Sequence, residues 1–407
     1  MNGKQSGRAG LRRVLGTPLL VFYGLGVIIG AGIYVLVGSV FAVAGTAAPW
    51  SFVLAGVLAA LTALSYAELA SRFPEAAGAA AYVKAAFGSD RLSQLTGLAV
   101  AVVVVVSTAS IARGVVGYLQ VFLPLPAAPL AGGIVLLFTL IALLDVRESV
   151  GLAAAMTLIE IAGLLLVIAA GWPDSAEAGG RFAALAPPGW DVNAWLGVAA
   201  GMFLALFAFI GFENMANMAE EARDPERSVP RAILISLGLS TLLYAAVASI
   251  AVLDIPLEAL TSSPVPLLLI VRNAAWFSSD LFAAIAVISV AGGVLIELVM
   301  LARLLYGMAH RGWAPKYLAV IAPRFGTPVR ATLCGGLIVL VLTVTLSLEH
   351  LVALTSTVTL LVFALVNVAL WRLQRRAPRT AGFRIPRALP PLAAAANVAL
   401  AAASLLV

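Results

Sequence analysis

The stretch GVIIGAGIYVLVG, residues 26–38, decides how this chain is interpreted. It lies inside an apolar run that begins near Leu15 and ends near Ala44, long enough to cross a bilayer as a helix. Four glycines fall within it, at positions 26, 30, 32 and 38, and a glycine inside a helix costs about 0.5–1 kcal/mol relative to alanine. The triplet GAG at residues 30–32 therefore needs a physical reason.

The composition indicates an all-α membrane protein. The chain has 407 residues, of which 62% are hydrophobic and 11% charged. A soluble domain is nearer half apolar and a quarter charged. Apolar runs recur along the whole chain, each near or above the roughly 20 residues that a membrane-spanning helix needs. They predict about eleven spans, at residues 15–44, 48–71, 93–122, 126–145, 149–171, 192–219, 229–253, 279–309, 329–348, 350–371 and 388–406.

The distribution of basic residues predicts the orientation. If the N-terminus is cytoplasmic, all but three of the 25 lysines and arginines lie in cytoplasmic segments or at cytoplasmic helix ends, the exceptions being Arg113, Arg181 and Arg272. This pattern predicts a multi-pass protein of the inner (plasma) membrane. The predicted divisions are a cytoplasmic segment (1–14), spans one to five (15–171), an outer loop (172–191), spans six to ten (192–371), a basic cytoplasmic loop (372–387) and a last span (388–407).

The sixth span carries a second interruption. It reads AWLGVAAGMFLALFAFIGFENMANMAEE, with Gly211 at mid-depth and Glu213 two residues later. Close packing through small residues is the alternative for Gly26 and Gly30, but packing does not explain a glycine beside a mid-membrane carboxylate. If spans one to five and six to ten form two repeats, the two glycine sites occupy the same position in each repeat. Because five is odd, the second repeat has the opposite orientation in the membrane. Paired Gly-interrupted helices point to a transporter site at the bilayer midplane.

Five stretches carry a resemblance to a known family. They are GVIIGAGIY in the first span, SYAELASRFPEAAGAAAYVKAAFG after the second, TLIEIAGLLLVI in the fifth, LFAFIGFENMANMAEEARDPERSVPRAIL from the sixth onward, and RLLYGMAHRGWAPKYLAVIAPRFGTPVRA after the eighth. In this order they resemble the amino acid–polyamine–organocation transporter superfamily. The resemblance implies a five-plus-five inverted-repeat, leucine-transporter-like fold with one additional C-terminal helix. It also implies secondary active transport of amino acids or related amines by alternating access, coupled to protons or to exchange.

Two broken helices offer partners for both charged groups of an amino acid. The helix that restarts near Gly32 presents unpaired N–H groups and its positive dipole end to a carboxylate. The first half of the sixth span ends near Phe209 and presents carbonyl oxygens to an ammonium group. The backbone predicted to contact substrate is that of Ile29, Gly30, Ala31, Gly32, Phe209, Ile210 and Gly211. The resemblance implies that an aromatic residue here closes the site, which makes Phe209 and Phe212 the predicted gate, with ordinary packing as the alternative.

Three carboxylates lie at mid-depth, where a charge is costly unless it faces a cavity or a partner. Glu213 is predicted to contact substrate, with titration or capping of the following half-helix as alternatives. Glu160 stands where several members of the superfamily carry a lysine, and it is the predicted proton carrier, with a structural hydrogen bond as the alternative. Glu297 is predicted to contact substrate or a proton. Arg113 is expected either to neutralise one of these carboxylates or to reach the membrane interface.

Several classes of function are excluded. The chain carries no nucleophile-and-base set, its two histidines and one cysteine form no metal-ligand pattern, and it has no Walker A motif, so neither an enzyme nor an ATP-driven pump is expected. No cofactor is predicted beyond a coupling ion. That ion is a proton or, in the alternative of a sodium symporter, sodium, for which Ser289 offers a hydroxyl. A polyamine or organocation antiporter is the other alternative. The expected partners are a small-molecule substrate and the bilayer, not nucleic acid, because the net charge of +6 reflects orientation signals.

Overall fold

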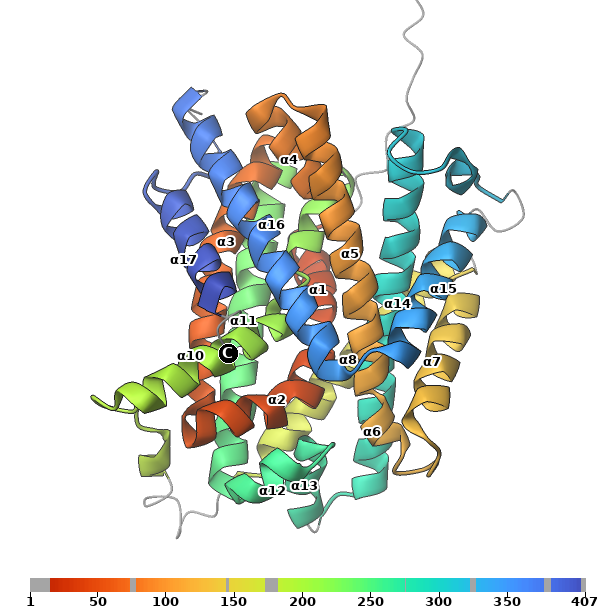
Figure 1. The fold of residues 1–407 in the computed structure, drawn as a ribbon. Coiled ribbons are helices and arrows are strands. Elements are labelled where there is room, and N and C mark those ends of the chain that lie inside the picture. The colour runs from red at the N-terminus through yellow and green to blue at the C-terminus, as the bar shows by residue number, and fades with distance from the viewer. Residues whose placement is uncertain are drawn as a thin grey trace, which may run out of the picture.

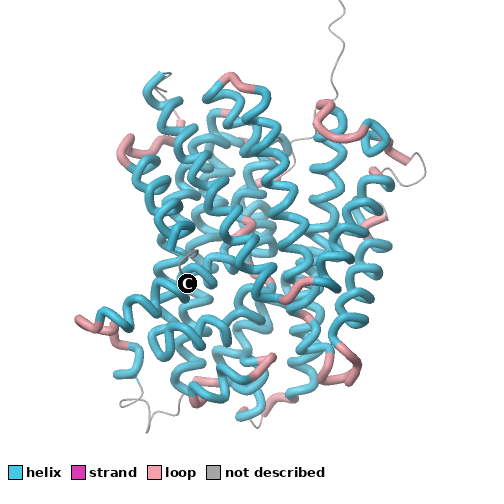
Figure 2. The backbone as a smooth tube through the Cα atoms, viewed as in Figure 1, coloured by secondary structure: helices cyan, strands magenta, loops and turns pink. Residues whose placement is uncertain are grey.

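The computed structural model describes residues 15–73, 78–143, 146–172, 182–274, 276–322, 327–376 and 382–403. Within these ranges the chain is nearly all helical, as Figure 2 shows. The one isolated β-bridge among the described residues pairs Leu15 with Ala222. Helices lie where each of the eleven spans is predicted.

The first half of the chain forms the helices of predicted spans one to five (Figure 1). They are α1 (Thr17–Ile28) and α2 (Ala31–Ala44), α3 (Ala48–Arg72), α5 (Asp90–Gly114) with the short α6 (Val116–Leu119), α7 (Ala127–Ile141) and α8 (Val146–Ala170). The second half forms α10 (Val192–Leu206) with the 3₁₀ helices η3 (Phe207–Phe209) and η4 (Phe212–Glu221), α11 (Pro225–Asp254), α14 (Ser279–His310), α15 (Val329–Thr345), α16 (Leu348–Arg376) and α17 (Leu389–Ala403).

Length and apolar composition allow six of the described helical stretches to cross a membrane. They are 32–72, 90–119, 192–216, 225–254, 279–310 and 348–376. Five shorter apolar helices also lie in the described residues, at 17–28, 127–141, 155–170, 329–345 and 389–403. The first of these is short because the first predicted span is divided into two helices.

Shorter helices cap the two ends of the bundle. Helix α4 (Gly78–Phe87) lies at the end where α3, α14 and α16 finish, and α12 (Leu257–Ser262) and α13 (Pro266–Asn273) lie at the opposite end (Figure 1). These are called the α4 end and the α12 end below. The remaining short 3₁₀ helices in the described ranges are η1 (Gly45–Ala47), η2 (Phe182–Leu185) and η5 (Lys316–Ala319).

Local sequence explains where several long helices begin. The Ser89 hydroxyl accepts a hydrogen bond from the Leu92 N–H at the start of α5, and Ser278 does the same for Leu281 at the start of α14. The Asp191 carboxylate accepts from the Asn193 and Ala194 N–H groups at the start of α10. Such caps pair N–H groups that a helix cannot pair internally. No side chain caps α2, which begins in the middle of the bundle.

Candidate functional site

The first predicted span is broken at Ile29 and Gly30. Helix α1 ends at Ile28, and the backbone is extended at Ile29 (φ −70°, ψ 132°) and at Gly30 (φ 179°, ψ −147°) before α2 begins. The Ile29 N–H still donates to the Leu25 carbonyl, at 2.8 Å, so α1 is paired to its last turn. The first N–H groups of α2 have no partner within their own helix, and they concentrate positive dipole charge beside the break.

The sixth predicted span is broken at Ile210 and Gly211. Gly211 has φ 127°, a conformation that side-chain-bearing residues rarely adopt, and Ile210 is extended. The chain then continues as the 3₁₀ helix η4 and not as the α-helix expected for a span to residue 219. The Glu213 Oε2 accepts a hydrogen bond from the Gly211 N–H, at 2.9 Å. Glu213 thus caps the start of η4, one of the roles predicted for it.

The two breaks contact each other through glycines. A Cβ placed on Gly32 would lie 2.3 Å from the Cα of Ala208, and a Cβ placed on Gly211 would lie 2.5 Å from the carbonyl oxygen of Val27. Ordinary carbon contacts need about 3.5–4 Å. Gly32 and Gly211 therefore let the broken spans approach to backbone contact. The sequence argument that packing does not explain Gly211 is thus wrong, because this glycine packs directly against the Val27 carbonyl.

Gly30 is different from its neighbour Gly32. A Cβ placed on Gly30 would have no heavy atom within 4 Å, apart from its chain neighbours. Close packing therefore does not account for a glycine at this position. The site beside Gly30 is open space at the junction of two helix ends.

One tyrosine hydroxyl joins the two breaks. The Tyr244 hydroxyl, from α11, lies 2.8 Å from the Ile28 carbonyl oxygen and 3.0 Å from that of Ala208. The first carbonyl ends α1, and the second lies in η3. Two further buried tyrosines hold α2: the Tyr34 hydroxyl donates to the Glu160 carbonyl, and the Tyr118 hydroxyl donates to the Tyr34 carbonyl, both at 2.8 Å. Sequence reasoning missed these tyrosines, although a phenol inside an apolar span signals that its hydroxyl needs a partner.

The three mid-membrane carboxylates gather around the breaks. Glu160 on α8 is 3% exposed, and Glu297 on α14 is 7% exposed. One carboxylate oxygen of each is buried and has no hydrogen-bond partner among the described residues. Glu297 interacts electrostatically with Glu213, and Glu160 lies within electrostatic reach of Tyr34 and Tyr244. Glu213 and Glu297 thus form one group of hydrogen-bond acceptors at the breaks, and Glu160 forms a second.

The two predicted gate residues lie on opposite sides of Gly211 and are fully buried. The Phe209 ring packs against the Tyr244 ring, with centroids 5.1 Å apart. The Phe212 ring packs against Phe363 at 5.1 Å and against Tyr66 at 5.8 Å. Each phenylalanine is thus part of an aromatic cluster beside the second break, and its role as a gate stays a prediction.

A family model described as amino acid permease matches residues 15–407 of this chain. The chain belongs to the amino acid permease family. Members of this family are transporters and permeases rather than enzymes, and the chain is a multi-pass membrane protein of the amino acid–polyamine–organocation superfamily, as the motifs predicted.

The names of individual relatives refer to different substrates. A mitochondrial cationic amino acid transporter 3 of Arabidopsis thaliana is 30% identical over 388 residues, covering 88% of this chain and 62% of that protein. A vacuolar cationic amino acid transporter 2 of the same plant is 31% identical over 402 residues, covering 90% and 60%. A branched-chain amino acid permease of Bacillus subtilis is 29% identical over 402 residues, covering 92% and 83%. The chain spans less than two thirds of the length of these plant transporters.

Other predicted residues lie apart from the breaks or have local partners. The Arg113 guanidinium lies 3.4 Å from the Val344 carbonyl oxygen, and neither salt bridge found among the described residues involves it. Its predicted role as neutraliser of a mid-membrane carboxylate is therefore not observed. The Ser289 hydroxyl donates to the Ile285 carbonyl within its own helix, at 2.8 Å. The described residues contain no group of three His, Cys, Asp or Glu side chains suited to a metal ion.

A buried carboxylate ties three segments together at the α4 end. Glu68 on α3 is fully buried and forms a salt bridge with Arg72. Its Oε2 accepts hydrogen bonds from the Gln374 side chain on α16, at 2.9 Å, and from the Ile385 N–H before α17, at 2.8 Å. The Arg223 N–H donates to the Leu15 carbonyl at 3.0 Å and ties the start of α1 to the end of η4. These contacts fix α3, α16 and the two broken spans relative to each other at the α4 end.

Proposed function

We propose that this permease is a secondary active transporter that moves amino acids across a membrane by alternating access. The observation that carries the proposal is the contact between two helix breaks, with an uncapped helix start, open space at Gly30 and carboxylates around it. Non-helical backbone at membrane depth persists only where protein buries it or where it lines a cavity. Broken helices at the midplane are the usual site of substrate and ion binding in transporters.

The substrate pose follows from the polarity of the helix ends. The amino acid carboxylate accepts hydrogen bonds from the first N–H groups of α2, those of Ala31 and Gly32, and the open space at Gly30 admits it. The ammonium group binds carbonyl oxygens at the end of η3, those of Phe209 and Ile210. The Tyr244 hydroxyl donates to the Ala208 carbonyl and so holds the two breaks in a fixed relative position while the substrate binds.

The carboxylate pair favours an amino acid with a basic side chain. Glu213 and Glu297 interact with each other, and Glu297 keeps one buried oxygen without a partner. A cationic side chain between them would relieve their repulsion and pair that oxygen, whereas a neutral side chain would do neither. The names of the plant relatives agree with this choice, and the name of the Bacillus relative agrees with a neutral substrate.

The coupling ion in this proposal is a proton carried by Glu160. Its side chain is buried beside the first break. A carboxyl group there that gains and loses a proton couples proton binding to the conformation of the break. The conformational change is rocking of spans one, two, six and seven against the rest of a five-plus-five inverted repeat, residues 15–171 and 192–371. The α4 end, where α11 begins and α16 finishes, is the cytoplasmic end at the plasma membrane, because the arginines of these two helix ends follow the positive-inside rule.

Ligand-induced thermal stabilisation tests the proposal. The purified protein is heated with each of the twenty amino acids, with polyamines and with decarboxylated amines, at acidic and neutral pH, with and without sodium. Binding to the folded state raises stability with the logarithm of ligand concentration over Kd. Stabilisation by arginine or lysine, and not by their decarboxylated forms, is the expected result. A response to neutral amino acids alone would refute the basic side chain, and no response to any amino acid would refute the function.

A further inference from the structure

A basic pocket lies at the α4 end, on α16 and α4 and separate from the helix breaks. Its volume is about 290 Å³, and it is lined by Phe87, Val368, Trp371, Arg372, Arg375 and Arg376. Three of these six residues are arginines and none is acidic. The pocket therefore concentrates positive charge at one end of a membrane-spanning helix.

Aromatic rings hold two of the arginines in place. The Arg372 guanidinium lies 5.1 Å from the centre of the Phe87 ring, and its Nε donates to the Ala86 carbonyl, at 3.0 Å. The Arg375 guanidinium lies 5.0 Å from the centre of the Trp371 ring. Both distances fall within the range of cation–π attraction. The guanidinium groups are thus partly ordered before any ligand binds, which lowers the entropy lost on binding.

An apolar stripe on α16 leads into this pocket. Side chains at three- and four-residue intervals share one face of a helix, and on α16 one such face carries Leu354, Val358, Leu361, Leu365 and Val368. Leu354 is 43% exposed and Leu361 is 53% exposed. The stripe therefore faces lipid, and Val368 belongs both to it and to the pocket. Trp371 follows three residues later, as expected for a tryptophan at the headgroup level.

We propose that this pocket binds an anionic phospholipid, with the phosphate on Arg375 and Arg376 and one acyl chain along the α16 stripe. The carboxyl end of α16 contributes about half a negative charge, which three guanidinium groups outweigh. A soluble phosphate would use the arginines but not the exposed leucines. A lipid would contact both the arginines and the exposed leucines, and the pocket lies where the arginines meet the apolar stripe.

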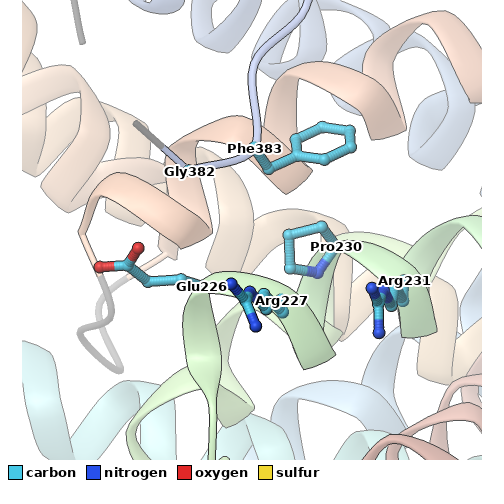
Figure 3. A pocket seen from close by; sticks show the side chains of 6 residues that line it. All are labelled: Glu226, Arg227, Pro230, Arg231, Gly382 and Phe383. Atoms are coloured by element: carbon cyan, nitrogen blue, oxygen red, sulfur yellow. The ribbon is translucent and has the colours of Figure 1, made fainter. Parts of the chain in front are cut away.

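The chain offers a matched control pocket. A cavity of about 460 Å³ at the same end is lined by Glu226, Arg227, Pro230, Arg231, Gly382 and Phe383 (Figure 3). It also contains two arginines, but a carboxylate shares its lining. Removing Arg227 and Arg231 thus subtracts the same charge from the same end of the protein without touching the α16 pocket.

Native mass spectrometry of the full chain in detergent measures the first bound lipid during titration with phosphatidylglycerol. Each basic residue near an anionic headgroup contributes about fivefold to binding, so Arg375→Gln with Arg376→Gln should weaken the first binding step about 25-fold. The Arg227→Gln with Arg231→Gln variant should stay within about twofold of the parent. Equal melting temperatures without added lipid show that each variant is folded, and Arg376→Gln alone, with an expected loss of about fivefold, replaces the pair if the pair does not fold.

Three outcomes would overturn the proposal. Equal weakening in both double variants would show that only the overall surface charge matters. Unchanged binding in the α16 variant would remove Arg375 and Arg376 from the site. Competition by glycerol phosphate as effective as that by the whole lipid would show that the pocket takes soluble phosphates. None of these outcomes depends on transport, so they are separate from the test of the proposed function.

Discussion

The substitution Gly30→Ala tests whether Gly30 serves substrate binding or helix packing at the first break. The φ of Gly30 is 179°, which is extended backbone open to any residue, and a Cβ there meets no heavy atom within 4 Å. Substitutions of this kind, which touch nothing, change stability by no more than about 0.5 kcal/mol. Gly32→Ala, two residues later, is the control, because its Cβ would lie 2.3 Å from the Cα of Ala208. The backbones of α2 and η3 would have to separate by more than about 1 Å, at a cost of about 1–3 kcal/mol or more.

The expected effect of Gly30→Ala on binding is much larger than its effect on folding. If the substrate carboxylate lies beside Gly30, a methyl group there displaces it, and the loss of one charge-assisted hydrogen bond, about 1.5–3 kcal/mol, weakens binding at least tenfold. At a ligand concentration of about 100 times Kd, the parent gains about 2.7 kcal/mol of stability. A tenfold weaker variant gains about 1.4 kcal/mol at the same concentration.

The assay is thermal unfolding of the parent and both variants, with and without the best ligand of the amino acid panel. Without ligand, Gly30→Ala should unfold at the parent temperature, and Gly32→Ala should unfold lower. With ligand, Gly30→Ala should lose about half of the stabilisation or more. Full stabilisation of Gly30→Ala by ligand would refute the placement of substrate beside Gly30. A lower unfolding temperature for Gly30→Ala without ligand would refute the open space.

Three further predictions address the rest of the site. Glu160→Gln should abolish the dependence of uptake on a proton gradient in proteoliposomes while exchange of internal for external substrate persists; accumulation that is still driven by the gradient would exclude Glu160 as the proton carrier. Tyr244→Phe removes the hydroxyl shared by two carbonyls and should cost about 1 kcal/mol in stability and several-fold in substrate affinity, measured by the same thermal titration; unchanged affinity would contradict its role in aligning the breaks. Glu68→Gln places an amide N–H₂ against neighbouring donors and should cost about 3–5 kcal/mol, whereas Lys84→Gln, which removes the more exposed pair with Asp90, should cost about 1 kcal/mol or less in the same melting assay. Equal shifts for these two variants would contradict the buried network.

The sequence alone predicted the helices and the places where two of them break. Apolar runs of membrane length have one stable solution in lipid, because only a helix pairs its own backbone there. The breaks were readable for the same local reason: Gly30 and Gly32 stand in mid-run, and Gly211 stands beside a carboxylate that would be costly against lipid. These signals lie within a few residues of the feature they predict.

Tertiary structure decided which of the glycines packs and which stays open. Gly32 lies against Ala208, and Gly30 faces open space, although both belong to the same triplet. The bond from Tyr244 to Ile28 joins residues 216 positions apart, and the bond from Glu68 to Ile385 spans 317 positions. Such pairings depend on how helices rotate and slide against each other, and a shift of one residue turns a side chain by about 100° around its helix. No local pattern carries that register, so only the packed bundle determined which side chains hold the breaks.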